Sequence, residues 1–184
     1  MVKTLSNMLP LGTQAPHFVL LDVVKQKQVH FPSDITYKAT VICFICNHCP
    51  FVKHINTGLV RLANDYLPQQ VQFLAINSND VTRYPEDSPA HMSEIAKELH
   101  YPFPYLYDET QEVAKAYQAA CTPDFFVFDT KLKLVYRGQL DDARPGNHTP
   151  VTGESIRQAL DAILSDTVVT TEQKTSIGCN IKWK

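Results

Sequence analysis

Residues 40–50 of the chain read TVICFICNHCP, which sets two cysteines three positions apart between an apolar segment and a proline. Segment 40–45 is short, apolar and β-branched, as is typical of a buried parallel strand. Segment 50–66 carries apolar side chains at helical spacing, and Pro50 suits the first helical position because no N–H is needed there. The sequence therefore predicts a strand, a Cys-X-X-Cys loop and a helix in direct succession.

Cys49 falls at the N-cap of the predicted helix. A thiolate there meets unpaired backbone N–H groups and the positive end of the helix dipole, which lower the pKa of a cysteine to roughly 3.5–7.5. We therefore predict that Cys49 is the nucleophile of a redox site and that Cys46 is its nearest thiol partner.

Half of a structural zinc site is the main alternative for two cysteines at this spacing. Structural zinc needs four ligands, often as two such pairs, and the chain has no second pair. The remaining ligands would have to converge in space from His48, His54, Cys121 and Cys179. We therefore favour redox chemistry and predict no metal.

Length and composition predict one compact domain over residues 1–184, with a C-terminal tail from about 166 to 184. A chain of 184 residues that is 44% hydrophobic can bury a substantial core. The net charge of −2 gives no sign of nucleic acid or an anionic membrane as a partner. Residues 1–10 lack the apolar core of a signal peptide, so we expect a cytoplasmic protein. Five cysteines in that reducing compartment favour transient or catalytic chemistry.

The rest of the chain alternates strand and helix patterns after a hairpin predicted at 17–21 and 28–31. Further strands are predicted at 71–76, 125–128 and 133–136, and helices at 91–99, 110–119 and 154–164. The strand at 71–76 runs into a polar stretch, 77–80, and catalytic groups gather at such carboxyl ends of parallel strands. The tail reads as polar and irregular and ends in SIGCNIKWK.

Several motifs carry a family resemblance over nearly the whole chain. Residues 12–20, GTQAPHFVL, resemble the GxxAPxFxL opening of peroxiredoxins and TlpA-type thioredoxins, and residues 121–126, CTPDFF, resemble their Thr-cis-Pro segment. Four further stretches, CNHCPFVKH, AINSND, YRGQLDD and SIGCNIKW, extend the resemblance. Together, all these motifs resemble the peroxiredoxin-like, AhpC/TSA-related subgroup of the thioredoxin superfamily. The resemblance implies an α/β thioredoxin fold, in three α/β/α layers with a mixed sheet, an N-terminal β-hairpin extension and a C-terminal tail.

The resemblance also implies a place for substrate beside Cys49. Pro123 is a candidate for a cis proline that lies opposite the Cys49 sulfur. Thr122 would then offer backbone hydrogen bonds to the chain that carries a substrate cysteine.

Departures from the relatives limit the chemistry. In the peroxiredoxin pattern TxxC the threonine and peroxidatic cysteine positions fall on Cys49 and Val52, and the activating arginine falls on Pro123. In the thioredoxin pattern Cys49 corresponds to the nucleophile, Val52 replaces the second cysteine, and Cys43 replaces the buried acid. His48 is therefore a candidate for proton handling.

The other cysteines have less defined roles. Cys43 lies among apolar neighbours and is expected to be a buried structural residue. Cys121 serves packing or acts as a second resolving thiol. Cys179 is a candidate resolving or regulatory thiol if the tail docks through Ile181 and Trp183.

The resulting hypothesis is a thiol-disulfide oxidoreductase without a cofactor. The Cys49 thiolate attacks a protein or small-molecule disulfide, Cys46 resolves the mixed disulfide, and an external thiol reductant resets the pair. One alternative is a thiol peroxidase that reduces hydroperoxides through a Cys49 sulfenic acid. Another is a non-catalytic module that binds metal or a partner through Cys46, His48, Cys49 and Cys179.

Overall fold

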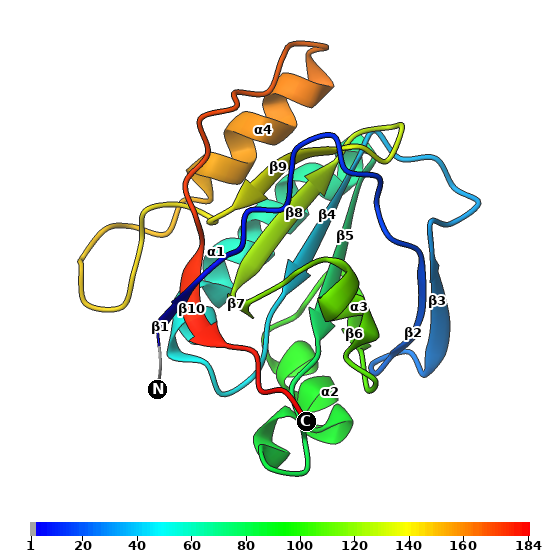
Figure 1. Ribbon diagram of the computed structural model, residues 1–184, viewed down its shortest axis with the longest axis vertical. Helices are drawn as coiled ribbons and strands as arrows, with labels where there is room; N and C mark the ends of the chain where they lie inside the picture. The colour runs from blue at the N-terminus through cyan, green and yellow to red at the C-terminus, as the bar shows by residue number, and fades with distance from the viewer. Residues whose placement is uncertain (1–2) are drawn as a thin grey trace.

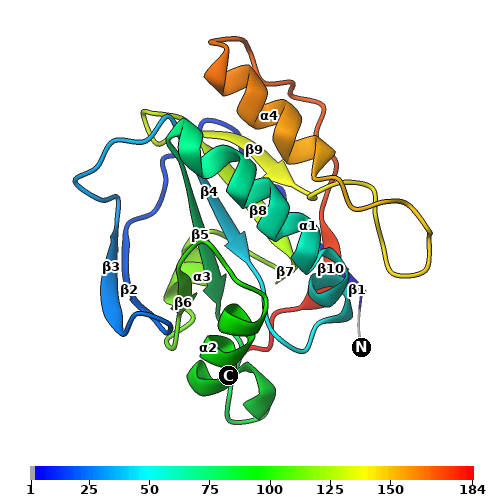
Figure 2. The same ribbon diagram turned by 180° about the vertical axis from the view of Figure 1, so that it is seen from behind.

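The computed structural model describes residues 3–184, in which helices pack on both faces of a seven-stranded mixed sheet (Figures 1 and 2). In spatial order the strands are β3 (Lys27–Phe31), β2 (Phe18–Asp22), β6 (Tyr105–Tyr107), β5 (Val71–Asn77), β4 (Ala39–Phe44), β8 (Asp124–Phe128) and β9 (Leu134–Gly138). Strands β4, β5 and β6 are parallel to one another, whereas β8 runs antiparallel to β4. The hairpin of β2 and β3 joins the sheet at β6.

Strand β4 lies in the middle of the sheet, and all six of its residues are buried. Val41 and Cys43 face one hydrophobic core, and Ile42 and Phe44 face the other. Burial on both faces explains why the sequence is continuously apolar rather than alternating. Strand β4 leads directly into the cysteine loop, which lies at the carboxyl end of the parallel strands.

Two layers of helices cover the sheet. Helices α1 (Pro50–Tyr66), α2 (Pro89–Glu98) and α4 (Glu154–Leu164) pack on one side, and α3 (Glu112–Ala116) packs on the other. Short 3₁₀ helices occupy Leu67–Gln69 and Pro85–Asp87, labelled η1 and η2. Helix α1 buries Leu59 and Leu62 completely, and each such side chain stabilises the fold by about 1.5–3 kcal/mol. This packing fixes the start of α1, and with it Cys49, against the end of β4.

A second, three-stranded sheet joins the two ends of the described chain. Strand β10 (Ile177–Asn180) lies between β1 (Lys3–Leu5) and β7 (Cys121–Thr122), antiparallel to both (Figure 1). The tail is therefore not irregular at residues 177–180, contrary to the prediction. Its sequence, IGCN, carries no strand pattern of its own, and the strand forms because two distant segments supply its hydrogen-bond partners.

The predicted thioredoxin fold with a β-hairpin extension is confirmed. The sequence did not predict β6, which is only three residues long and follows directly after Pro104. The helix predicted at 110–119 is shorter, because Gln111 adopts a left-handed conformation at its start. Within residues 3–184, no helix combines the length and apolar character needed to cross a membrane.

Candidate functional site

The sulfur of Cys49 lies at the amino end of α1, where the sequence placed it. Cys49 is the N-cap, with Pro50 as the first helical residue, and its side chain is fully buried. Its Sγ lies 3.1 Å from the carbonyl oxygen of Thr122 and 3.2 Å from Sγ of Cys179. Thr122 precedes Pro123 through a cis peptide bond, as the resemblance implied.

Hydrogen-bond donors around Cys49 stabilise its thiolate. The thiol of Cys46 is the strongest donor, and the backbone N–H of Val52, the thiol of Cys179 and the hydroxyl of Thr122 add to it. Together they outweigh burial and lower the pKa of Cys49 to about 4. The site therefore holds a thiolate at neutral pH.

Cys46 is the donor in this arrangement, and its own pKa moves the other way. The hydrogen bond to Cys49, burial and the negative charge of Asp87 all raise the pKa of Cys46 well above its usual value. Its Sγ also lies 3.4 Å from Oγ1 of Thr122 and 4.0 Å from Nδ1 of His48. Cys46 is thus a protonated partner of the Cys49 thiolate.

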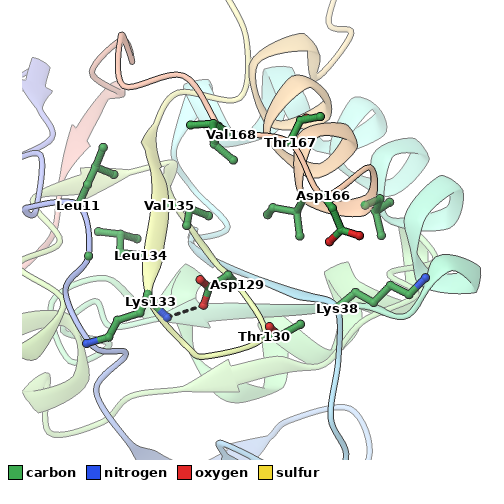
Figure 3. Close-up of a pocket in the computed structure, with 14 residues that line it drawn as sticks. Leu11, Lys38, Asp129, Thr130, Lys133, Leu134, Val135, Asp166, Thr167 and Val168 are labelled. Atoms are coloured by element: carbon green, nitrogen blue, oxygen red, sulfur yellow. Dashed lines mark hydrogen bonds between the residues drawn. The ribbon is translucent and has the colours of Figure 1, made fainter.

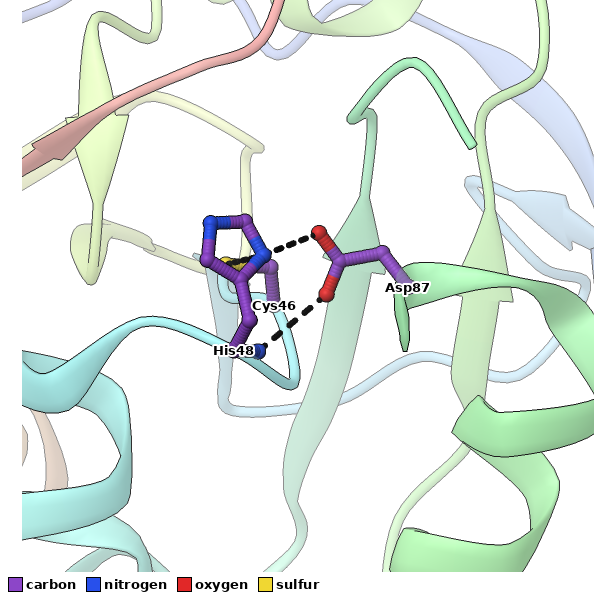
Figure 4. A group of neighbouring side chains, drawn as sticks. All are labelled: Cys46, His48 and Asp87. Carbon is purple, nitrogen blue, oxygen red and sulfur yellow. Dashed lines mark hydrogen bonds and ion pairs between the residues drawn. The ribbon is translucent and has the colours of Figure 1, made fainter. Parts of the chain in front are cut away.

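His48 is paired with a carboxylate that the sequence did not indicate (Figure 4). Its Nδ1 lies 2.6 Å from Oδ2 of Asp87, which is completely buried in η2. The hydrogen bond to Asp87 raises the pKa of His48, and the contact with His48 helps to lower the pKa of Asp87. Because Nδ1 donates its proton to Asp87, the nitrogen that faces Cys46 is a donor rather than a base.

Asp87 also holds the backbone of the cysteine loop. Its Oδ1 accepts the N–H of Asn47 at 2.8 Å and that of His48 at 3.2 Å, while Oδ2 accepts Nδ2 of Asn79 at 2.7 Å. The side chain of Asn47 in turn donates to the carbonyl of Glu86 at 2.8 Å. One buried carboxylate thus fixes both residues between the two cysteines.

Cys46, His48 and Asp87 are also the kinds of side chain that bind zinc. Their ligand atoms lie within 4.8 Å of one another. The Nδ1–Oδ2 separation is that of a hydrogen bond, so a metal ion would have to displace the proton between these atoms. Cys49 and Cys179, the other members of the hypothetical metal module, contact each other instead.

The end of the chain closes the site from the opposite side. The N–H of Lys182 donates to Oδ1 of Asn79 at 2.8 Å, and the N–H of Asp80 donates to the carbonyl of Lys182 at 2.8 Å. The ammonium of Lys182 lies 5.5 Å from the centre of the Tyr84 ring, which stacks on His48. The polar stretch after β5 therefore ties the tail to the cysteine loop.

The remaining two cysteines have other contacts. The thiol of Cys43 lies 3.7 Å from the carbonyl oxygen of Leu74, and that of Cys121 lies 3.6 Å from the carbonyl oxygen of Pro123. Burial raises the pKa of both thiols above the usual value. Both are consistent with packing roles, and a resolving role for Cys121 stays a prediction.

The structure brings Cys46, Cys49, His48, Thr122 and Pro123 together at one end of the sheet, as the sequence predicted. It adds Asp87, which the sequence did not predict. Asp87 lies in a proline-containing segment without a periodic pattern, so no sequence signal pointed to it. Asn79 is buried and hydrogen-bonded on both sides, to Asp87 and to Lys182.

A hollow of about 640 Å³ lies at the other end of β4 (Figure 3). Lys38 lines it just before β4 begins, whereas Cys46 and Cys49 follow the end of that strand. The turn at 129–133 and the end of α4 with residues 166–169 complete its walls. The hollow is therefore separate from the cysteine site.

The chain belongs to the AhpC/TSA family, whose model matches residues 11–137. This places it among thioredoxin-fold proteins with thiol redox chemistry. No curated protein matches the chain.

Solved structures share the fold of this chain. An uncharacterised conserved protein from Geobacillus kaustophilus is 65% identical, with a TM-score of 0.97 over 100% of this chain and 97% of that one. A hypothetical protein from Sinorhizobium meliloti is 48% identical, with a TM-score of 0.96 over 98% of each chain. The thioredoxin domain of a thiol-disulfide oxidoreductase from Bacteroides vulgatus is 14% identical, with a TM-score of 0.63 over 82% of this chain and 98% of that one. At that identity the likeness shows the fold alone.

Proposed function

We propose that the protein is a thiol-disulfide oxidoreductase with Cys49 as its nucleophile. The observation that carries the proposal is the setting of the Cys49 sulfur, which lies at a helix N-cap in contact with two other thiols. A stabilised thiolate with a second thiol in reach has both groups that disulfide exchange requires. Membership of the AhpC/TSA family supports the same class of chemistry.

The reaction needs two steps and no cofactor. First, the Cys49 thiolate attacks one sulfur of a substrate disulfide, which forms a mixed disulfide and releases the other half as a thiolate. Second, another protein thiol loses its proton and attacks the Cys49 sulfur, which releases the remaining half. The substrate disulfide gains two electrons and two protons, and an external dithiol later reduces the new protein disulfide.

The partners of the reaction follow from this chemistry. The substrate is a protein or small-molecule disulfide, and the reductant is an external thiol. A reducing, cytoplasmic setting suits cysteines that form only transient disulfides. The sequence assigns the second step to Cys46, but Cys179 also contacts Cys49, and the two thiols differ in their electrostatic surroundings.

We expect the thiolate of Cys49 to persist far below neutral pH. A pKa of about 4 keeps the sulfur ionised at pH 6, where a cysteine of ordinary pKa, about 8.5, is almost fully protonated. The difference in far-ultraviolet thiolate absorbance between the wild type and Cys49→Ser measures this directly. It should stay constant from about pH 8 to about pH 5.

Unfolded protein in urea is the control, since its cysteines titrate at their ordinary pKa. If the folded difference spectrum titrated together with the unfolded protein, Cys49 would not be a stabilised thiolate and the proposed nucleophile would be wrong.

Reduction of hydroperoxides is the second candidate, because a thiolate oxidises more readily than a thiol. The peroxidatic position holds Val52, and Pro123 stands where the activating arginine is expected. We therefore expect the second-order rate with hydrogen peroxide to fall several factors of ten below that of a dedicated peroxiredoxin, each factor being about 1.4 kcal/mol of activation free energy. Stopped-flow oxidation at peroxiredoxin speed would make peroxidase the better assignment.

A further inference from the structure

Strand β10 occupies the edge of β7, directly beside the cis peptide bond at Thr122–Pro123. Cys179 pairs with Thr122 and Asn180 pairs with Cys121, both in antiparallel register, and the N–H of Ile181 donates to the carbonyl of Ala120 at 3.1 Å. An extended substrate chain that added a strand at this edge would need the same backbone groups. The protein's own tail therefore lies where a substrate chain would dock.

The register also brings the sulfur of Cys179 to the point where a substrate sulfur would sit. Its distance of 3.2 Å from Sγ of Cys49 is a direct sulfur–sulfur contact. Both side chains are buried, at 2% and 0% exposure, so no solvent separates them. The contact joins residues 130 positions apart in the chain and is specified by the pairing of β10 with β7.

Gly178 shows how closely β10 approaches β7. A Cβ at this position would lie 1.9 Å from the carbonyl oxygen of Thr122 and 3.1 Å from the backbone nitrogen of Pro123. Both atoms belong to the backbone, so a side chain cannot be accommodated by a rotamer change. A glycine is therefore required for the strand to bring Cys179 into contact with Cys49.

Both ends of β10 are anchored to the site. The hydroxyl of Ser176 donates to the carbonyl of Pro123 at 2.5 Å, and the N–H of Lys182 donates to Asn79 at 2.8 Å. We call residues 176–182 the strap. An extended protein chain can reach the β7 edge only if the whole strap is displaced, whereas a small molecule needs only a local opening.

The surrounding charges distinguish Cys179 from Cys46. Burial and the contact with Cys49 raise the pKa of Cys179, but the positive charge of Lys182 acts to lower it. The negative charge of Asp87 raises the pKa of Cys46 further. Once Cys49 is in a mixed disulfide its negative charge is gone, which removes one obstacle to ionising either thiol. The remaining charges then favour the thiolate of Cys179.

We propose that the strap is a built-in substrate strand: it supplies Cys179 as the resolving thiol of Cys49 and keeps extended protein chains off the β7 edge, so the substrate is a small disulfide. This inference rests on the proposed function and narrows it. Cys179 loses its thiol proton to solvent and its thiolate attacks the Cys49 sulfur of the mixed disulfide; the Cys49–Cys179 bond forms as the bond from Cys49 to the substrate breaks, and the remaining substrate half leaves as a thiolate. An external dithiol then reduces the Cys49–Cys179 disulfide to two thiols and is itself oxidised to a disulfide.

The first test uses an aromatic disulfide, 5,5′-dithiobis(2-nitrobenzoate), with the reduced full chain. Wild type and Cys46→Ser should each release two thionitrobenzoate ions per reactive Cys49, and peptide mapping should find a Cys49–Cys179 disulfide. Cys179→Ser should release one and keep the mixed disulfide on Cys49. The assignment is overturned if Cys46→Ser retains the mixed disulfide while Cys179→Ser resolves it. If Cys49 forms no mixed disulfide in any variant, the proposed function itself fails.

The second test concerns the size of the substrate. With excess dithiothreitol as reductant, Gly178→Ala should reduce the disulfides of insulin at least tenfold faster than wild type, because the added Cβ lifts the strap from Thr122 and dithiothreitol resolves the mixed disulfide in place of the displaced Cys179. Gly146→Ala adds the same atom in a loop where nothing lies within 4 Å, at a backbone φ of +88° that strains any side chain; it therefore controls for destabilisation alone, and its rate of insulin reduction should match wild type. Ser176→Ala removes one anchor of the strap without adding atoms, so its rate of insulin reduction should rise by less. This variant replaces Gly178→Ala in the test if Gly178→Ala does not fold. Wild-type insulin reduction as fast as that of the strap variants would refute the exclusion of protein chains.

Discussion

Replacement of Cys49 by serine is expected to abolish exchange with a small disulfide, leaving only the uncatalysed rate. The thiolate, not the thiol, is the attacking group in such exchange, and a serine hydroxyl at the same N-cap stays protonated at neutral pH. The other two thiols at the site cannot replace it, because burial raises the pKa of both Cys46 and Cys179 and the charge of Asp87 also raises that of Cys46, and these causes remain without Cys49. Release of the small thiol, followed by absorbance under pseudo-first-order conditions, measures the loss.

Cys121→Ser is the matched control for this experiment. Cys121 is equally buried, yet its thiol contacts the carbonyl of Pro123 rather than the Cys49 sulfur. This variant should retain most of the wild-type rate. If Cys49→Ser kept a substantial rate and Cys46→Ser lost it, the roles of nucleophile and partner would be exchanged.

Asp87→Asn is expected to lower the free energy of unfolding by about 3 kcal/mol, since it leaves one side of a largely buried ion pair without its partner. The carboxylate accepts four hydrogen bonds, and an amide cannot accept all of them. Urea denaturation gives the stability. Glu86→Gln is the control, because Glu86 is the adjacent acid but its side chain is exposed.

The effect of Asp87→Asn should depend on pH in a defined sense. The pKa of Asp87 is lowered, so its contribution is present above the unfolded value of about 3.9 and is lost as the pH falls through the folded value. The pKa of His48 is raised, so its contribution is present below about 6.5 and is lost as the pH rises through the folded value. The stability difference should therefore be largest between about pH 4 and 6.5. A difference independent of pH would mean that Asp87 acts only through the backbone of the loop.

The position of Cys49 could be predicted from the sequence because it depends on local rules. An apolar β-branched run, a Cys-X-X-Cys loop and a proline at the first helical position specify strand, loop and helix without reference to the rest of the chain. The structure has these elements at β4 and α1, with Cys49 as the N-cap between them. Most strands of the seven-stranded sheet followed in the same way from their apolar patterns, whereas the three-residue β6 did not.

The partners of Cys49 and His48 could not be fixed in this way, because they come from distant segments. Asp87 reaches the loop from a short 3₁₀ helix in a segment rich in proline and charge, which has no periodic pattern. Cys179 reaches Cys49 through a strand whose sequence, IGCN, gives no strand signal. In both cases tertiary pairing determines the local structure.

The pairing of β10 with β1 and β7 has a consequence for biosynthesis. Cys179 lies 130 residues after Cys49, and at translation rates of about 5–20 residues per second that interval takes roughly 6–26 s. During this time α1 and its N-cap thiolate can form before the strand that covers them exists. A newly made chain therefore lacks the strand that covers Cys49 until residues 177–180 have been synthesised, and during that interval Cys179 cannot lie against the Cys49 sulfur.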